Sequence, residues 1–332
     1  MAERRHFLYL FETEGAFESA YTGEDYHEPW VSYVREVERV DYNKSEHEKM
    51  KEVPLTFEIT SNGNITWSYY NDGDYEDAHT TIYYRKNDGD WTVMPRTLSV
   101  VSGDAVQFRG DNDGYGDTDM GDGNFDSFSE ETTAGFILKG NIMSLIDSTG
   151  FTTASTLPTS CYQNFNSLFY GCTSLTSAEN LILPATALTM GCYRHMFDSC
   201  TSLTTAPELP ATTLVDFCYY GMFAGCTNLT KAPKLPATAL TQACYTAMFQ
   251  SCTSLTTAPE LPATILADSC YGSMFYGCTN LNYIKCLATS ISASNCTSYW
   301  VTGVASSGTF VADSNTQWAS GVNGIPEGWI RQ

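Results

Sequence analysis

The chain has 332 residues, with 17 Lys and Arg against 38 Asp and Glu, and its formal net charge is -21. This excess of acid argues against nucleic acid as a partner, because phosphates select Lys and Arg. The sequence contains no run of 18 apolar residues, so we expect no membrane insertion. Its first residues lack the apolar core of a secretory signal peptide, so we expect synthesis in the host bacterial cytoplasm.

The composition changes near residue 150, since all 12 cysteines lie beyond residue 160. The predicted fold class is a multidomain, mainly β protein with repeats. Its parts are an N-terminal anchoring or oligomerisation segment (1–52), a β domain (53–148), a repeat solenoid (149–285) and a C-terminal capping segment (286–332).

The segment 1–52 contains HFLYLFETEGAFESAYTGEDYHEPW, which is rich in aromatic residues. It is too short and too often interrupted by charge to form its own core, so we expect an arm that packs on another subunit of a dimer or trimer. The segment resembles the opening of structural proteins of Bacteroidales phages, including crAss-like ones. That resemblance implies attachment to a capsid or another virion protein.

The segment 53–148 alternates polar and apolar residues around Asn-Gly and Asp-Gly turns, as in VPLTFEITSNGNITWSYY and TIYYRKNDGDWTVMP. Such patterns indicate hairpins. About seven short strands in a domain of this length predict an immunoglobulin-like sandwich.

An acidic loop in this domain, DNDGYGDTDMGDGNFDS, combines aspartates with glycines that allow sharp turns. Hard oxygen ligands at this density suit calcium. The EF-hand pattern is not met, because Gly121 or Tyr115 stands where it needs Asp or Asn, so a solvated acidic turn is the alternative. No other cofactor is expected. The candidate calcium ligands are Asp111, Asp113, Asp117, Asp119 and Asp122.

The segment 149–285 repeats a unit of 26 residues. A fixed period of this length predicts a solenoid, in which each unit buries its apolar face against its neighbours. Helical spacing in CYYGMFAGC predicts a helix, or a tight turn of one, followed by a strand. Prolines recur in the strand and lack a ladder N–H, so the strand must be short or partly polyproline-like. These prolines are Pro207, Pro233 and Pro259.

The stretch MFAGCTNLTKAPKLP resembles AFxGCxSLxxxxIP, the repeat core of the BspA-like leucine-rich repeat proteins of Bacteroides and relatives. It is similar to a 26-residue variant of that core, and five copies agree. The resemblance implies a right-handed leucine-rich-repeat solenoid used for adhesion and binding, and it implies no reaction.

The cysteine pairs, such as Cys218 and Cys226, raise the alternatives of disulfide, metal ligand and structural thiol. On a helix the two would lie about 12 Å apart, beyond the roughly 7 Å limit for a disulfide. Zinc ligands are spaced about two to four residues apart. A free, buried thiol that fills space is therefore favoured over a disulfide or a metal site.

The last segment, 286–332, loses the repeat but gains large aromatic residues. We expect Trp300, Trp318 and Trp329 to cover the last coil, with sugar stacking as the alternative.

No nucleophile motif, phosphate loop or carboxylate pair occurs in the sequence. His195 stands where other repeats have Gly, Ala or Ser, which indicates a surface residue. Asp198, Asp216 and Asp268 are single members of variable positions. We therefore expect no enzymatic activity.

These features favour a bacteriophage virion structural protein, a capsid (head) fibre or decoration protein that displays its repeats to host-surface or mucin glycans. The alternatives are a tail fibre or receptor-binding protein, a BspA-like bacterial surface adhesin, and a solenoid enzyme that degrades polysaccharide. The expected contact residues are the variable dipeptides Arg194-His195, Tyr220-Gly221, Thr246-Ala247 and Gly272-Ser273.

Overall fold

A computed structural model describes residues 48–68, 80–112, 115, 126–128, 130–160 and 162–332. The chain divides into two compact units, Met1–Glu48 and Lys49–Gln332. The predicted anchoring segment 1–52 lies almost entirely outside the described residues, so its role stays a prediction. In the part of the chain that is described, no helix is both long and apolar enough to cross a membrane.

The second unit is mainly β, as predicted. Helical residues within the described ranges are limited to 48–50 and the short 3-10 helix η1 (Ile142–Leu145). The strands are β1 (Leu55–Ile59), β2 (Gly63–Ser68), β3 (Ile82–Lys86), β4 (Thr92–Val93), β5 (Thr97–Val100), β6 (Ala105–Gly110), β7 (Ser127–Phe128), β8 (Phe136–Asn141), β9 (Leu175–Ile182), β10 (Tyr283–Cys286), β11 (Thr309–Ala312) and β12 (Ile330–Arg331).

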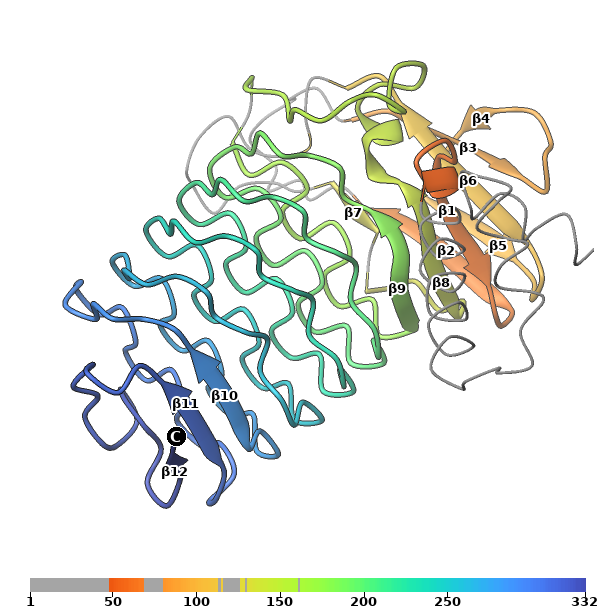
Figure 1. The fold of residues 1–332 in the computed structure, drawn as a ribbon. Helices are drawn as coiled ribbons and strands as arrows, with labels where there is room; N and C mark the ends of the chain where they lie inside the picture. Colours follow the sequence, from red (N-terminus) through yellow and green to blue (C-terminus); the bar gives the residue numbers. More distant parts are fainter. Residues whose placement is uncertain (1–47, 69–79, 113–114, 116–125, 129, 161) are drawn as a thin grey trace, which may run out of the picture. The chain divides into compact units, whose positions relative to one another are not determined.

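Two sheets form the first part of this unit (Figure 1). One has the strand order β4-β3-β6-β1-β8-β9 and the other β5-β2-β7. Phenylalanine rings join them, because Phe128 on β7 lies 4.6 Å from Phe57 on β1 and 4.9 Å from Phe108 on β6. All three side chains are fully buried, so this cluster is the core between the sheets.

The predicted boundaries at 148/149 and 285/286 stay predictions, and strands lie close to both. β8 and β9 stand on either side of the first boundary and pair in parallel within one sheet. β10 spans the second boundary and pairs in parallel with β11.

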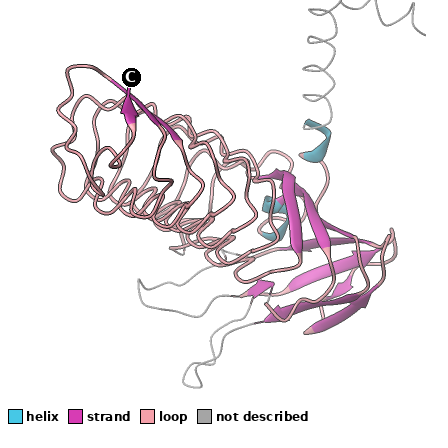
Figure 2. Cartoon of the chain, turned by 90° about the horizontal axis from the view of Figure 1, so that it is seen from below, coloured by secondary structure: helices cyan, strands magenta, loops and turns pink. Residues whose placement is uncertain are grey.

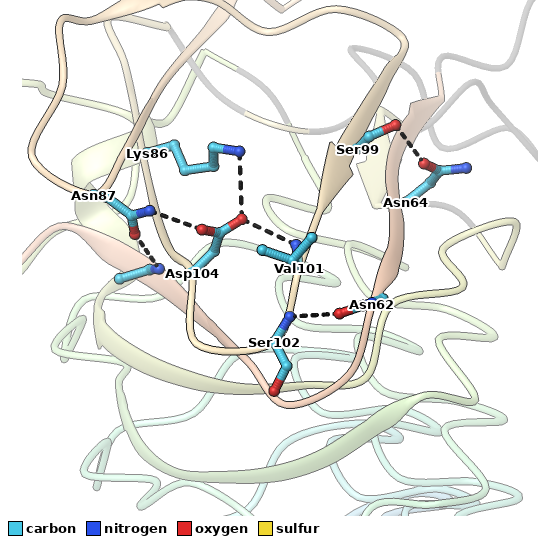
Figure 3. A network of polar contacts seen from close by, with 9 residues as sticks. Asn62, Asn64, Lys86, Asn87, Ser99, Val101, Ser102 and Asp104 are labelled. Atoms are coloured by element: carbon cyan, nitrogen blue, oxygen red, sulfur yellow. Dashed lines mark hydrogen bonds and ion pairs between the residues drawn. The ribbon is translucent and has the colours of Figure 1, made fainter.

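Asp104, in the turn between β5 and β6, connects this turn to the turn between β3 and β4 by hydrogen bonds (Figure 3). Its carboxylate accepts hydrogen bonds from the backbone N–H of Val101 (3.0 Å) and from Nδ2 of Asn87 (2.7 Å). Lys86 Nζ lies 3.3 Å from the same carboxylate. These donors hold the pKa of Asp104 below its ordinary value, and the Val101 hydrogen bond is the largest cause.

Asp104→Ala is expected to lower the free energy of unfolding by about 1–3 kcal/mol near neutral pH, because it leaves these donors without their acceptor. A lowered pKa means that the carboxylate stabilises the fold fully above the ordinary value of 3.8 and progressively less as the pH falls below it. Urea unfolding of both proteins at about pH 7 and about pH 3 checks this. If the difference in the free energy of unfolding between the two proteins were as large at about pH 3 as at about pH 7, the role of the Asp104 carboxylate would be contradicted.

From about residue 163 the chain winds into 26-residue coils that stack side by side (Figure 1). Isolated parallel bridges connect neighbouring coils, for example Thr205 with Lys231 and Thr213 with Ala239. Longer strands occur only at the two ends of the stack, as β9 and β10. The coils between them carry Pro207, Pro233 and Pro259, so the prediction that proline keeps these strands short is confirmed.

The predicted helix in each coil is wrong. The segment Cys218 to Cys226 is a run of turns, and Figure 2 draws this side of the stack as loop. One set of N–H groups donates three residues back, as Met222 N does to Tyr219 O (3.3 Å). The N–H groups of the residues in between donate to the next coil, as Phe223 N does to Met248 O (3.0 Å). A helix would instead keep these bonds within the segment.

Every fourth residue of the turn segment has a left-handed backbone. In the coil that contains Cys218, the φ angles of Phe217, Gly221 and Gly225 are 61°, 60° and 70°. A right-handed helix does not tolerate such angles. The equivalent left-handed residues of the other coils are Gln163, Ser167, Gly171, Gly191, His195, Ser199, Ala243, Ala247, Ser251, Ser269, Ser273, Gly277, Asn295, Tyr299 and Gly303.

Ser251→Gly is expected to raise the free energy of unfolding by up to about 1 kcal/mol, because Ser251 has a φ of 60° and glycine adopts this angle without strain. In a helix interior the same change would cost roughly 0.5–1 kcal/mol. Thermal or urea unfolding measures the sign, and Ser251→Ala, which keeps a Cβ, is the matched control. A loss of stability in Ser251→Gly alone would argue against the turn structure.

Two columns of stacked aromatic rings run through the coils. One passes through Phe169, Phe197, Phe223, Phe249 and Phe275, with ring centroids 5.4–5.9 Å apart. The other contains Tyr193, Tyr219, Tyr245 and Tyr271, at 5.9–6.2 Å.

Trp300 ends both columns, since its ring lies 6.3 Å from Tyr271 and from Phe275. Trp318 stacks on Trp300 at 5.5 Å, and the Trp329 ring nitrogen donates to Ala305 O (2.7 Å). All three tryptophans are buried. The prediction that they cover the last coil is therefore confirmed, and their burial leaves no free ring face for sugar stacking.

Candidate functional site

A hollow of about 310 Å³ opens on the turn side of three consecutive coils. Each coil supplies part of its wall, so the stacking of the repeats creates it. Its lining combines small residues with an imidazole, a carboxylate, a phenol and an amide. The lining residues are His195, Asp198, Tyr220, Ala224, Gly225, Ala247, Gln250 and Ser251.

A hydrogen-bonded chain of side chains forms the wall on the first coil. His195 Nδ1 lies 2.8 Å from Asp198 Oδ2. Because a carboxylate oxygen accepts this bond, Nδ1 carries the hydrogen. Ser199 Oγ donates to the other carboxylate oxygen (2.8 Å). The exposed fractions of the His195 and Asp198 side chains are only 27% and 18%, so both are held in one geometry and still reach solvent.

The second coil makes room for the imidazole. A Cβ on Gly221 would lie 2.5 Å from the His195 ring, so no larger residue fits there without a shift. Tyr220 meets the same ring edge-on at 5.3 Å. The position of His195 therefore depends on the residues found 25 and 26 places later.

Arg194 adds a cation beside the hollow. Its guanidinium lies over the Tyr220 ring, 5.1 Å from the centroid, which is a cation–π contact. Its Nε is buried and finds no hydrogen-bond partner among the described residues. Tyr220 is thus fixed between Arg194 and His195.

The arrangement of His195, Asp198 and Ser199 differs from a nucleophilic triad. In a triad the serine hydroxyl bonds to the imidazole, while the acid bonds to the other ring nitrogen. Here the Ser199 hydroxyl bonds to the acid instead. The geometry suits the binding of a neutral, hydroxyl-rich molecule, because donors and acceptors alternate beside an aromatic ring.

The ten cysteines from Cys192 to Cys296 are buried thiols, as predicted. Some of them also donate hydrogen bonds, which the sequence did not indicate: Cys226 Sγ donates to Phe197 O (3.0 Å), and Cys252 Sγ repeats this contact one coil later (3.1 Å). Burial raises the pKa of Cys278 to about 12, so these thiols are poor nucleophiles. Cys161 lies outside the described residues.

The predicted calcium site lies mostly outside the described residues, since Asp113, Asp117, Asp119 and Asp122 belong to those ranges. Asp111 accepts a hydrogen bond from Ser148 N (2.8 Å). Within the described ranges no group of three or more His, Cys, Asp or Glu side chains is arranged to hold a metal. Calcium binding therefore stays a prediction.

The predicted contact dipeptides supply three of the eight residues that line the hollow. His195, Tyr220 and Ala247 line it, whereas Gly272 is buried. The sequence interpretation missed a second outward pair of positions, four residues further on, which supplies Asp198, Ala224 and Gln250.

Two signals in the sequence point to the missed residues. His195 and Asp198 are three residues apart, which allows a contact in a tight turn. Gly221 follows His195 by one repeat length, so the imidazole lies against a residue that has no side chain.

Comparisons with known proteins do not assign the chain. No family model matches it. No curated protein and no solved structure matches it either.

Proposed function

We propose that this protein is a non-enzymatic bacteriophage virion protein, a capsid (head) fibre or decoration protein, whose repeats bind glycans of the host surface or of mucin. In this proposal 53–148 is an immunoglobulin-like spacer, and the coils are a BspA-like leucine-rich-repeat solenoid. The protein assembles as a dimer or trimer and attaches to other virion proteins through 1–52. The phage resemblance of 1–52 and the adhesive use of BspA-like repeats support this role.

The hollow across three coils is the observation that carries the binding part of the proposal. Ligand sites are concave, largely preformed, and combine apolar surface with a few fixed polar groups. The hollow offers fixed groups of this kind, because the His195–Asp198 contact and the Tyr220 ring are already in place. Hydroxyl groups of a sugar can donate to Asp198 or accept from the Gln250 amide.

Aromatic and amide side chains favour a sugar over other neutral ligands. The half-buried Tyr220 presents an apolar ring with a polar hydroxyl tip, which suits a ligand that is apolar on one face and polar at its edge. Arg194 lies against that ring and holds it in one position. A ring that is fixed before binding loses little entropy on binding.

A glycan array carrying bacterial surface and mucin glycans tests the binding role. We expect signals for the wild-type chain and loss of most of the signal in Tyr220→Ala. Gln242→Ala is the control, because Gln242 is exposed in the repeats but does not line the hollow. No signal from the wild-type chain, or equal signals from wild type and Tyr220→Ala, would overturn this role.

Mass spectrometry of purified, nuclease-treated virions tests the virion role separately. We expect the protein to remain with the particles through density-gradient purification. Its absence from the particles would overturn the virion role and would favour a cellular adhesin.

A further inference from the structure

We propose that the hollow is the centre of an extended site for a linear polysaccharide, which lies along the stacking direction and contacts one coil after another. This inference rests on the proposed function and names its ligand class. It concerns the outer column, which we define as the residue two positions before the second cysteine of each coil: Tyr170, Asp198, Ala224, Gln250 and Tyr276.

Backbone hydrogen bonds keep the outer column in register. The carbonyl oxygen of Asp198 accepts from Gly171 N (2.8 Å), and that of Ala224 accepts from Ser199 N (2.7 Å). The carbonyls of Gln250 and Tyr276 accept in the same way from the coil before them, each at 2.7 Å. The five side chains therefore leave the backbone at equivalent positions of consecutive coils.

The side chains of the outer column are graded in size about its centre. Ala224 is the smallest and lines the hollow. Asp198 and Gln250 stand one coil away on either side, and Tyr170 and Tyr276 stand two coils away. These tyrosines are 45% and 43% exposed, so both rings reach solvent. A hollow bracketed by two exposed rings is shaped for a ligand longer than one ring.

A row of small residues runs beside the outer column. The next residue of each coil is Gly171, Ser199, Gly225, Ser251 or Gly277. All five have a left-handed backbone, which glycine adopts without strain, and none of the five has a side chain larger than that of serine. Gly225 and Ser251 line the hollow, and the row continues past them to Gly277, whereas at the other end the Glu130 side chain lies against Gly171.

The spacing of the coils suits a chain of sugar units. Neighbouring rings in the phenylalanine column, one residue before the outer column, lie 5.4–5.9 Å apart. This distance is close to the length of one pyranose unit, so successive sugars of an extended chain would meet successive coils. A peptide strand has a shorter rise of about 3.3 Å per residue and would lose register within a few coils.

A length series tests this inference. The probes are a monosaccharide, a trisaccharide and a pentasaccharide cut from the linear glycan that gives the strongest array signal. In calorimetric titration we expect the affinity to rise at least about tenfold from monosaccharide to trisaccharide, and about tenfold again to pentasaccharide, because linked contacts add without a new association cost. Equal affinities would show that the hollow takes a single sugar and would overturn the extended site.

Variants at the two ends of the outer column separate this inference from the proposed function. Tyr170→Ala and Tyr276→Ala are each expected to weaken pentasaccharide binding about fivefold to tenfold and to leave monosaccharide binding unchanged. Tyr83→Ala is the control, since Tyr83 is a 36% exposed tyrosine on β3, outside the repeats. Unchanged pentasaccharide binding in both end variants would overturn the extended site and leave Tyr220 and the hollow unaffected.

Discussion

Phe223→Ala is expected to lower the free energy of unfolding by about 3–5 kcal/mol, which is the usual cost of removing a buried phenylalanine ring. Phe223 is fully buried and stacks between Phe197 at 5.5 Å and Phe249 at 5.8 Å. Because each coil is stabilised only by its neighbours, a cavity at this position weakens two interfaces at once. Urea unfolding followed by tryptophan fluorescence measures the loss.

The control for this change is Thr212→Ala, an exposed residue of the same coil region. It is expected to change the free energy of unfolding by less than about 0.5 kcal/mol. A loss below about 1 kcal/mol in Phe223→Ala would mean that the coils do not depend on the ring column and would contradict the packing described above.

Ala224→Tyr is expected to lower the affinity for the best array glycan by at least about 100-fold, about 2.7 kcal/mol. A tyrosine at this position is expected to fill the hollow, since Ala224 lines it. The fold should tolerate the change, because tyrosine already stands at the equivalent positions 170 and 276 of the outer column. Calorimetric titration measures binding, and the unfolding midpoint reports whether the fold is kept.

Ala224→Ser is the matched control, because it changes the same residue but leaves the hollow open. Its affinity is expected to stay within about threefold of wild type, about 0.7 kcal/mol. Full glycan binding by a stably folded Ala224→Tyr protein would place the binding surface elsewhere on the molecule.

The sequence predicted several features because each depends on a residue type with one dominant behaviour. The Asp-Gly turn indicated the hairpin of β3 and β4, where Asn87 and Asp88 adopt left-handed backbones. The hairpin predicted at the Asn-Gly turn is wrong, because β1 and β2, which flank it, belong to different sheets. The 26-residue period indicated stacked coils. The prolines indicated that strand pairing would be minimal, and the burial of Trp300 and Trp318 follows from their place after the last repeat.

The turn segment was misread as a helix because two periods coincide over so short a span. Tyr219, Met222, Phe223 and Cys226 face inward in a structure that repeats every four residues, and a helix repeats every 3.6. Over nine residues the two differ by less than one position. The sequence separates them only when coils are aligned, since Gly, Ala and Ser recur at the left-handed positions such as Gly221, Ala247 and Ser273.

The hollow was not predicted because it belongs to no single repeat. It exists where His195 of one coil meets Gly221 of the next and where Ala224 stands between two larger neighbours. Variable positions in a repeat show no shared chemistry when they are read along the chain. When the same positions are compared between neighbouring coils, they show which side chains lie next to one another.

The central claim, that the repeats bind a glycan in the hollow, is tested most directly by a crystal structure of the protein with the strongest array glycan. We predict electron density for sugar rings between Asp198 and Gln250, in contact with Tyr220. Density for the glycan only at another surface of the protein would contradict the claim.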